Sequence, residues 1–150
     1  MYGPHMYGPR RISTSSEAGF SLVELLVVIL IIGLLAAIAI PRFINQQNKA
    51  RSAEAQTAIR TAALAMETYS QDKGSYAGAD PGELEKIQPS LSDVHGRLGF
   101  DSLTPDRFKL HVDSTSNPPV RFFFDRRTSG LTVRTCDPSP EPGCPDGFWP

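Results

Sequence analysis

The sequence predicts an α+β protein in which one long N-terminal helix packs on a small antiparallel sheet. An apolar run fills residues 20–40, and an alanine-rich stretch with helical periodicity follows it as far as Lys73. Three short runs that alternate apolar and polar residues lie between residues 108 and 134. Helical and strand periodicities that occupy separate parts of a chain are typical of α+β folds.

The apolar run begins at Phe20 and ends at Ile40, and Ser21 and Glu24 are its only polar residues. At 1.5 Å per residue a helix of this length spans roughly 31 Å, about the thickness of the hydrocarbon core of a bilayer. A carboxylate near the centre of a bilayer costs roughly 2.5–3.5 kcal/mol, and less towards the interface. Glu24 therefore needs a partner, and it is the first candidate functional residue.

Two ordinary interpretations of this run compete with a specialised one. In the first, Arg10 and Arg11 precede the apolar core of a secretory signal peptide, and Ala37-Ile38-Ala39 is its cleavage site. Glu24 inside the core and Pro41 just after the cut argue against it. In the second, the run is a plain single-pass anchor. The basic residues on its two sides do not fix the orientation of that anchor.

The specialised interpretation comes from residues 19–29, Gly-Phe-Ser-Leu-Val-Glu-Leu-Leu-Val-Val-Ile, and residues 33–41, Gly-Leu-Leu-Ala-Ala-Ile-Ala-Ile-Pro. This segment resembles the N-terminus of type IV pilins and of the related type II secretion pseudopilins. The resemblance implies a class III prepilin leader, residues 1–19, which a prepilin peptidase removes by cutting between Gly19 and Phe20. It also implies methylation of the new amine of Phe20, and a role for Phe20 and Glu24 in assembly.

Elementary electrostatics supports a role for the Phe20 amine and Glu24 as an ion pair. A free α-amine has a pKa of about 7.7–8.0, so cleavage would place a cation at the start of the helix, one turn from Glu24. The resemblance implies that Glu24 meets the amine of a neighbouring subunit in a filament, where a low dielectric strengthens the pair. The alternative is that Glu24 pairs with the Phe20 amine of its own chain.

The helix is expected to weaken between Gly33 and Pro41, because proline removes the hydrogen bond to the Ala37 carbonyl. The resemblance makes local unwinding there plausible, and the alternative is a kink without unwinding. Residues 42–74 are expected to continue as an amphipathic helix that ends at Gly74. Its sheet-facing stripe is predicted to contain Ala55, Ile59, Ala62, Met66 and Tyr69.

The rest of the chain, residues 75–150, is predicted to form a connection, a sheet and a tail. Residues 75–106 contain many glycines and prolines and are expected to be irregular, apart from a helical turn at residues 84–87. The alternating runs then predict a three- to four-stranded antiparallel meander with one apolar face. Phe123 points to the other face, where the connection, Phe148 and Trp149, or another subunit would cover it.

The two cysteines, Cys136 and Cys144, lie in a proline-rich tail and are predicted to form a small disulfide loop. Two reduced thiols and half of a metal site are the alternatives, and the three histidines do not have ligand spacing to the cysteines. A disulfide implies an oxidising compartment, so the C-terminal domain would lie outside the cytoplasm.

The sequence does not suggest an enzyme. It contains no nucleophile elbow, no glycine-rich phosphate loop and no cluster of metal ligands, and we expect no cofactor. Oxygen ligands for calcium could come from Asp137, Glu141 and Asp146, but a solvated loop fits them better. A net charge of −1 gives no reason to expect nucleic acid, although a basic end of the meander leaves a weak DNA contact as an alternative. The residues of that basic end are Arg121, Arg126, Arg127 and Arg134.

These observations predict a structural subunit of a type IV pilus-like filament. Residues 20–41 would be its membrane and assembly helix, and residues 42–150 its head. Its partners would be other pilin subunits, the prepilin peptidase, the inner-membrane assembly machinery and membrane lipid. The precursor would cross the inner membrane once and the mature form would lie in an extracellular or periplasmic filament. The alternatives are a pseudopilin of a type II secretion system and an anchored or secreted binding domain that never assembles.

Overall fold

A computed structural model of the chain describes residues 19–150. Residues 1–18 hold all of the predicted leader except Gly19, so the leader lies outside the described residues. The chain divides into two compact units, one ending at Ile38 and the other running from Ala39 to Pro150. Helix α1, Leu22–Lys73, contributes residues to both units.

The first unit consists of the apolar start of α1. The helix was expected to begin at Phe20, and it begins two residues later, because its first hydrogen bond joins the Leu25 amide to the Ser21 carbonyl at 3.2 Å. Ser21 is thus the capping residue, and Gly19 and Phe20 precede the helix. The large apolar side chains from Leu22 to Ile38 are exposed throughout.

In the second unit the rest of α1 packs against a sheet. The five residues of the predicted sheet-facing stripe are all buried, which confirms that stripe; they are Ala55, Ile59, Ala62, Met66 and Tyr69. The helix ends where predicted, since Gly74 has a positive φ of 74° and its amide bonds the Ser70 carbonyl at 2.8 Å. A left-handed glycine of this kind is a common helix terminator.

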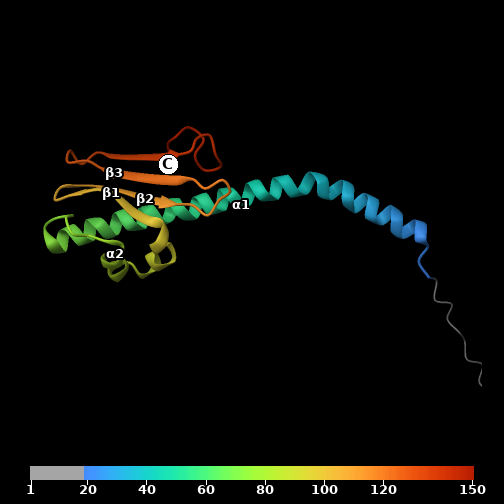
Figure 1. Ribbon diagram of the computed structural model, residues 1–150, viewed down its shortest axis with the longest axis horizontal. Coiled ribbons are helices and arrows are strands. Elements are labelled where there is room, and N and C mark those ends of the chain that lie inside the picture. Colours follow the sequence, from blue (N-terminus) through green and yellow to red (C-terminus); the bar gives the residue numbers. More distant parts are fainter. Residues whose placement is uncertain (1–18) are drawn as a thin grey trace, which may run out of the picture. The chain divides into compact units, whose positions relative to one another are not determined.

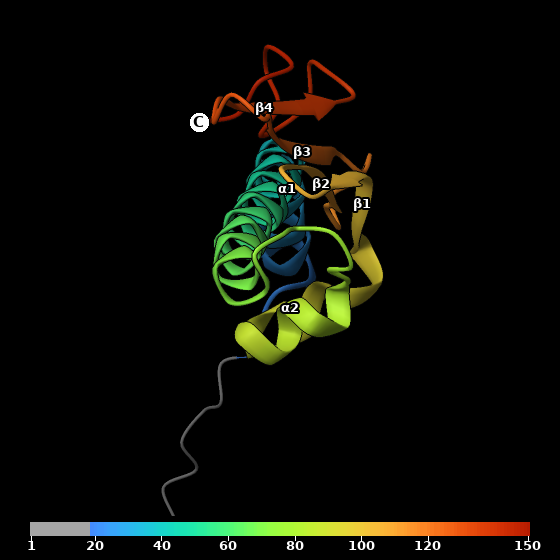
Figure 2. The same ribbon diagram turned by 90° about the vertical axis from the view of Figure 1, so that its left-hand side faces the viewer.

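The sheet has four antiparallel strands in the order β1-β2-β3-β4. Figures 1 and 2 show the sheet lying along the second half of α1. They are β1 Leu98–Thr104, β2 Arg107–Asp113, β3 Arg121–Arg126 and β4 Thr132–Asp137. The last three strands coincide with the alternating runs of the sequence, and their inward residues meet α1. The centre of this core consists of Phe108, Leu110, Val112, Val120 and Phe122, all fully buried.

The helical turn predicted at residues 84–87 is confirmed as part of a helix, but the prediction that the rest of residues 75–106 is irregular is wrong for most of it. The structure has helix α2 at Pro81–Ile87, the 3₁₀ helix η1 at Pro89–Arg97, and then β1. The prolines start helices here, and Asp80 caps α2 by accepting a hydrogen bond from the Glu83 amide at 2.8 Å. The sequence analysis counted Pro81 and Pro89 as helix breakers, whereas each lies in the first turn of a helix.

Strand β1 was missed because its alternation is interrupted twice. Gly99 pairs with His111, whose ring occupies the space that a side chain at position 99 would need. A bulge then follows between Phe100 and Ser102, and it lets Asp101 approach His111, with Oδ2 at 3.1 Å from Nδ1. A glycine and a bulge both weaken the period-2 pattern that identifies a strand.

The ring of Phe123 lies on the outward face of the sheet, as predicted, but its neighbours differ from those expected. It lies 6.4 Å from the ring of His111, and the Lys109 ammonium is 4.5 Å from its centroid. The indole of Trp149 instead packs edge-on against Phe122, at 6.1 Å. Trp149 reaches Phe123 only through a hydrogen bond from Nε1 to the backbone carbonyl, 3.1 Å long.

Candidate functional site

The predicted cleavage point lies in an open part of the described chain. Gly19 and Phe20 are exposed and precede the first turn of α1. A side chain at position 19 would meet nothing within 4 Å, and Phe20 keeps 79% of its surface exposed. Exposed chain outside helices and strands is where proteolytic cleavage concentrates. The accessibility of this bond therefore favours processing at the predicted position.

Glu24 lies in the first turn of α1 and is exposed. A carboxylate at this end of a helix interacts favourably with the partial positive charge of the unpaired amides. No ion pair joins Glu24 to any residue in the range 19–150. The uncut chain has a peptide bond, and no free amine, at Phe20. The charged partner that the sequence requires would appear only after cleavage.

The apolar segment that follows is long enough to cross a membrane. An 18-residue window of α1 has a mean hydropathy of 3.1, and none of it is buried within the chain. Such a surface needs lipid or other protein to cover it, since water is a poor solvent for it. This segment fits a precursor that is anchored in the inner membrane.

The predicted weak section does not interrupt the helix in the described chain. Residues 33–41 are helical throughout, with Pro41 inside α1. Local unwinding between Gly33 and Pro41 therefore stays a prediction for the assembled state.

A row of polar residues on α1 was missed by the sequence analysis, and it holds the loops of the head. The row consists of Asn48, Ser52, Gln56 and Arg60, spaced by four, so these side chains lie one above another on one face. The Asn48 amide group bonds both backbone groups of Asn117, at 2.8 and 3.1 Å. The remaining three side chains donate to carbonyl oxygens of the C-terminal tail; the acceptors are Pro142, Gly143 and Pro150.

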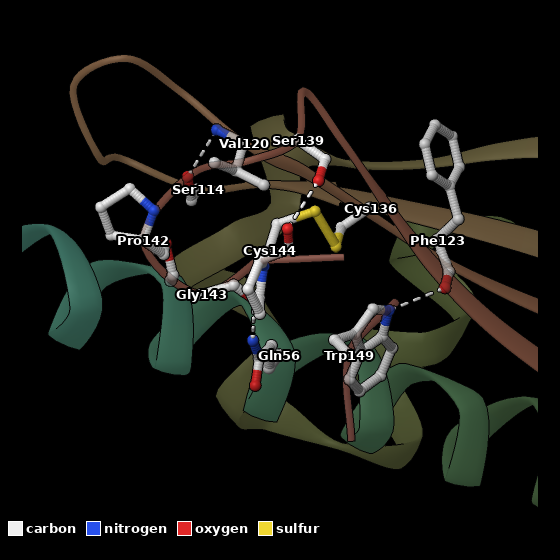
Figure 3. Close-up of a disulfide and its surroundings, with 12 residues drawn as sticks. Gln56, Ser114, Val120, Phe123, Cys136, Ser139, Pro142, Gly143, Cys144 and Trp149 are labelled. Carbon is white, nitrogen blue, oxygen red and sulfur yellow. Dashed lines mark hydrogen bonds between the residues drawn. A yellow bond between two sulfur atoms is a disulfide. The ribbon is translucent and has the colours of Figure 1, made fainter. Parts of the chain in front are cut away.

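The tail itself is closed by the predicted disulfide. Cys136 and Cys144 are bonded, with their Cα atoms 5.8 Å apart, and Cys144 is fully buried. Figure 3 shows the disulfide close to Gln56, which donates a 2.9 Å hydrogen bond to the Gly143 carbonyl. The loop is therefore tied to β4 through a covalent bond and to α1 through hydrogen bonds.

Trp149 fixes the end of the tail between α1 and the sheet. Its side chain is buried, and the guanidinium groups of Arg60 and Arg134 lie 5.2 and 5.5 Å from its ring. The tail also runs beside β4, where the Cys136 amide bonds the Gly147 carbonyl at 2.9 Å. It thereby covers part of the free edge of that strand, an edge that otherwise invites strand pairing.

The basic end of the meander has mostly internal partners. Arg121 forms a bidentate pair with Asp113, with distances of 2.6 and 2.8 Å, and these hydrogen bonds hold the pKa of the Asp113 carboxyl below its usual range. Arg126 pairs with Glu67 at 2.8 Å, and Arg127 lies 3.6 Å from Asp125. These contacts favour a solvated face with internal ion pairs over a DNA-binding face.

The alternative of a calcium site at Asp137, Glu141 and Asp146 gains no support from the described residues. No group of three or more His, Cys, Asp or Glu residues within residues 19–150 is arranged to hold a metal ion. Glu141 instead takes part in a short bridge with Cys144 through backbone groups, at 3.1 and 2.8 Å. Asp137 and Glu141 lie inside the loop that the disulfide closes, and Asp146 lies two residues beyond it.

Comparison with known proteins identifies a family motif over the predicted cleavage point and the apolar helix, and several relatives of the chain. Residues 14–40 match the family described as the prokaryotic N-terminal methylation motif. The type IV major pilin protein PilA of Myxococcus xanthus is 42% identical over 98 residues, which are 65% of this chain and 38% of that protein. The type II secretion system core protein G of Pseudomonas aeruginosa is 32% identical over 104 residues, which are 68% of this chain and 70% of that protein.

A third relative supports the same grouping. The core protein G of Escherichia coli is 33% identical over 97 residues and is covered over 67% of its length. No solved structure matches the chain. The chain spans well under half the length of the Myxococcus pilin, and about two thirds of the two core proteins. Taken with the methylation motif, this coverage shows that the chain belongs to the family of type IV pilins and type II secretion pseudopilins.

Proposed function

We propose that this protein is a structural subunit of a type IV pilus-like filament. In this proposal a prepilin peptidase cuts between Gly19 and Phe20, the Phe20 amine is methylated, and copies assemble through the helix of residues 20–41. The observation that carries the proposal is Glu24, an exposed carboxylate without an ion pair among residues 19–150, at the start of an apolar helix.

The chemistry of assembly follows from two changes of environment. Before assembly, lipid covers the apolar surface of α1, and after assembly the same surface of other copies covers it. The transfer brings Glu24 into a low-dielectric bundle, where a carboxylate without a partner is costly and a carboxylate beside an α-ammonium group is stabilised. A subunit in the wrong register would leave both charges unpaired, so the pair would set the register of the filament.

Removal of the Glu24 charge tests this role. We expect Glu24→Val and Glu24→Gln to leave the amount of membrane-inserted protein unchanged, or to raise it, while filament formation is lost. The measurement is the amount of this chain in sheared and sedimented fibres, relative to its amount in membranes. Glu54→Gln is the matched control, because Glu54 lies on the same helix but pairs with Arg97 in its own chain, at 2.7 Å. Normal fibres from both Glu24 variants would refute the proposed role.

The second candidate is a pseudopilin of a type II secretion system. The observation in its favour is the coverage of the core protein G relatives, which match this chain over a larger share of their length than the Myxococcus pilin does. A pseudopilin would support export of proteins, and its loss would abolish secretion without removing surface fibres. Calcium-dependent folding of the head would also favour this candidate over a pilin.

The third candidate is an anchored or secreted binding domain that does not assemble. It predicts normal behaviour of the Glu24 variants and no fibres from the wild type. The fibre fractions described above therefore distinguish it from the first candidate.

A further inference from the structure

We propose that the start of the head binds the headgroup of an anionic phospholipid in the outer leaflet of the inner membrane. The headgroup would lie against one face of α1, formed by Arg42, Asn45, Gln46 and Lys49, which we call the donor face. All four residues belong to the second unit, residues 39–150. The inference concerns the membrane-anchored chain before assembly, so it goes beyond the proposed filament function.

The donor face follows directly after the apolar run of α1. Its four residues occupy positions i, i+3, i+4 and i+7, which share one face of a helix. All four are exposed, and none of them forms a side-chain hydrogen bond or an ion pair within residues 19–150. Each carries N–H donors, on a guanidinium group, two amides and an ammonium group. Such a face suits a ligand with several acceptor oxygens.

The charge around the donor face is entirely positive. Residues 25–53 contain no carboxylate, but they contain Arg42, Lys49 and Arg51. Arg51 lies on another flank of α1 and donates to the Thr115 carbonyl at 3.1 Å. The two cations of the donor face have no such contact. The disulfide places this side of the membrane segment outside the cytoplasm, where cations oppose insertion in that orientation. An anion bound at the membrane surface would offset this cost.

The position of the donor face along α1 matches the headgroup layer. Arg42 lies two residues beyond Ile40, roughly 3 Å along the helix, and the headgroup layer on one side of a bilayer is roughly 5–7 Å thick. Lys49 lies two turns above Arg42. Its Cα–Cβ bond tilts toward the helix N-terminus, so the side chain is directed back toward the membrane. Both cations can therefore approach lipid phosphates.

The opposite side of the same segment is apolar, which favours a lipid over a free anion. Ile40, Phe43 and Ile44 each keep between 50% and 63% of their surface exposed. At 100° per residue these three side chains lie on the side of α1 away from the donor face. A helical segment with one basic and one apolar side lies at the boundary between headgroups and acyl chains. The apolar side would contact acyl chains while the donor face contacts the headgroup.

The chemistry of the two cations favours an anionic headgroup over a zwitterionic one. A guanidinium group donates two parallel hydrogen bonds to a phosphate, and an ammonium group adds a compact positive charge. A zwitterionic headgroup carries its own cation, which competes with Arg42 and Lys49 for the phosphate. An anionic headgroup lacks that competitor, and basic residues beside a membrane are attracted to such lipids.

Lipid binding by the full chain, purified in a non-ionic detergent, tests this inference. The chain is titrated with phosphatidylglycerol or phosphatidylcholine, and native mass spectrometry counts the bound lipids. We expect the wild type to bind phosphatidylglycerol several-fold more tightly. Arg42→Gln and Lys49→Gln should each weaken its binding about five-fold, and the double variant should bind both lipids equally. Arg42→Lys, which keeps the charge, should keep the preference.

Lys73→Gln is the matched control. Lys73 is an exposed lysine near the end of the same helix, and it has no ion pair within residues 19–150. Its substitution removes the same charge far from the membrane and should leave the lipid preference unchanged. Unchanged Trp149 emission in every variant would show that the head keeps its fold.

Equal binding of the two lipids by the wild type, or an unchanged preference in the double variant, would overturn the inference. Loss of the preference in Lys73→Gln would also overturn it, because net charge rather than a site would then explain the binding. Displacement of phosphatidylglycerol by inorganic phosphate would assign the face to a free anion instead. These results leave the filament function standing, whereas an absence of wild-type filaments would contradict that function and leave the lipid preference in place.

Discussion

Gly143, in the tail loop, is a position where both the backbone conformation and the available space favour glycine. Its φ is +94°, a conformation that side chains other than glycine rarely adopt, and a Cβ there would collide with the side chain of Ser52. Gly130, in the turn before β4, shares the positive φ, at +81°, but has open space around it. A comparison of substitutions at these two glycines therefore distinguishes the cost of backbone strain from the cost of steric collision.

We predict that Gly143→Ala destabilises the head more than Gly130→Ala does. A left-handed conformation costs a residue with a side chain roughly 1–2 kcal/mol, and both variants pay that amount. Only Gly143→Ala also forces the loop away from α1 and weakens the hydrogen bonds from Ser52 and Gln56. Unfolding of the detergent-solubilised chain, followed by the fluorescence of its single tryptophan, measures the difference. Equal losses of stability would show that the loop does not depend on close contact with the helix.

The Asp113–Arg121 pair predicts a dependence of stability on pH. The hydrogen bonds from Arg121 lower the pKa of Asp113 from its ordinary value of 3.8. A lowered pKa in the folded state contributes stability above the unfolded pKa, and this contribution disappears as the pH falls through the folded pKa. The stability difference between wild type and Arg121→Gln should therefore be present near about pH 6 and shrink below about pH 4. Because the pair is partly exposed the difference should be small, and one that grew with acid would contradict the assignment.

The hydrogen-bond partners of the polar row on α1 could not be predicted from the sequence. The spacing by four of Asn48, Ser52 and Gln56 is visible in the sequence, and it places them on one face. Their acceptors are backbone carbonyls 69 to 90 residues away, at Asn117, Pro142 and Gly143. Local periodicity contains no information on such distant backbone groups, so the sequence analysis did not identify the row.

The disulfide loop is held in two independent ways, by a covalent bond to β4 and by hydrogen bonds to α1. The bond between Cys136 and Cys144 joins it to β4, while side chains of α1 and the buried Trp149 hold the rest of the tail. Closing a short loop of this kind contributes on the order of 2–3 kcal/mol in the chain-entropy model. The covalent bond and the hydrogen bonds can therefore be tested separately.

Removal of the disulfide is predicted to weaken the head without releasing the tail. The double variant Cys136→Ser/Cys144→Ser should lose about 2–3 kcal/mol of unfolding free energy. Its Trp149 emission before unfolding should match that of the wild type, because the indole keeps its contacts with Phe122 and Arg60. A red-shifted emission without denaturant would show that the disulfide alone positions the tail.

The regularity of the apolar pattern in each strand explains which strands could be predicted from the sequence. The inward residues of β2 and β3 make the apolar face that the alternating runs predicted, against the buried stripe of α1. On β4 the same face carries Thr132, Arg134 and Cys136, because these residues pair with Arg126, Phe124 and Phe122. Strand β1 and the 3₁₀ helix before it lack such a pattern, because Gly99 and the bulge at Asp101 serve a contact with His111. The need for that contact arises only once β1 and β2 are paired.

For the whole molecule, the apolar part of α1 requires an environment of lipid or of other protein that covers it. Its large apolar side chains are exposed from Leu22 to Ile40, and burial of apolar surface is worth about 25 cal/mol per Å². The sequence was sufficient to predict this segment, since a run of that length and composition has few alternatives. Neither the sequence nor a single uncut chain contains the amine that Glu24 is proposed to meet, because cleavage creates it.

Intact-mass measurement of the chain in purified filaments would show whether cleavage before Phe20 creates the amine that Glu24 is proposed to meet. We expect a polypeptide that begins at Phe20, carries one added methyl group on its N-terminal amine and retains the Cys136–Cys144 disulfide. Fragmentation of the N-terminal peptide would locate the methyl group. A mature chain that begins at Ile40, or filaments built from chains that keep residues 1–19, would contradict it.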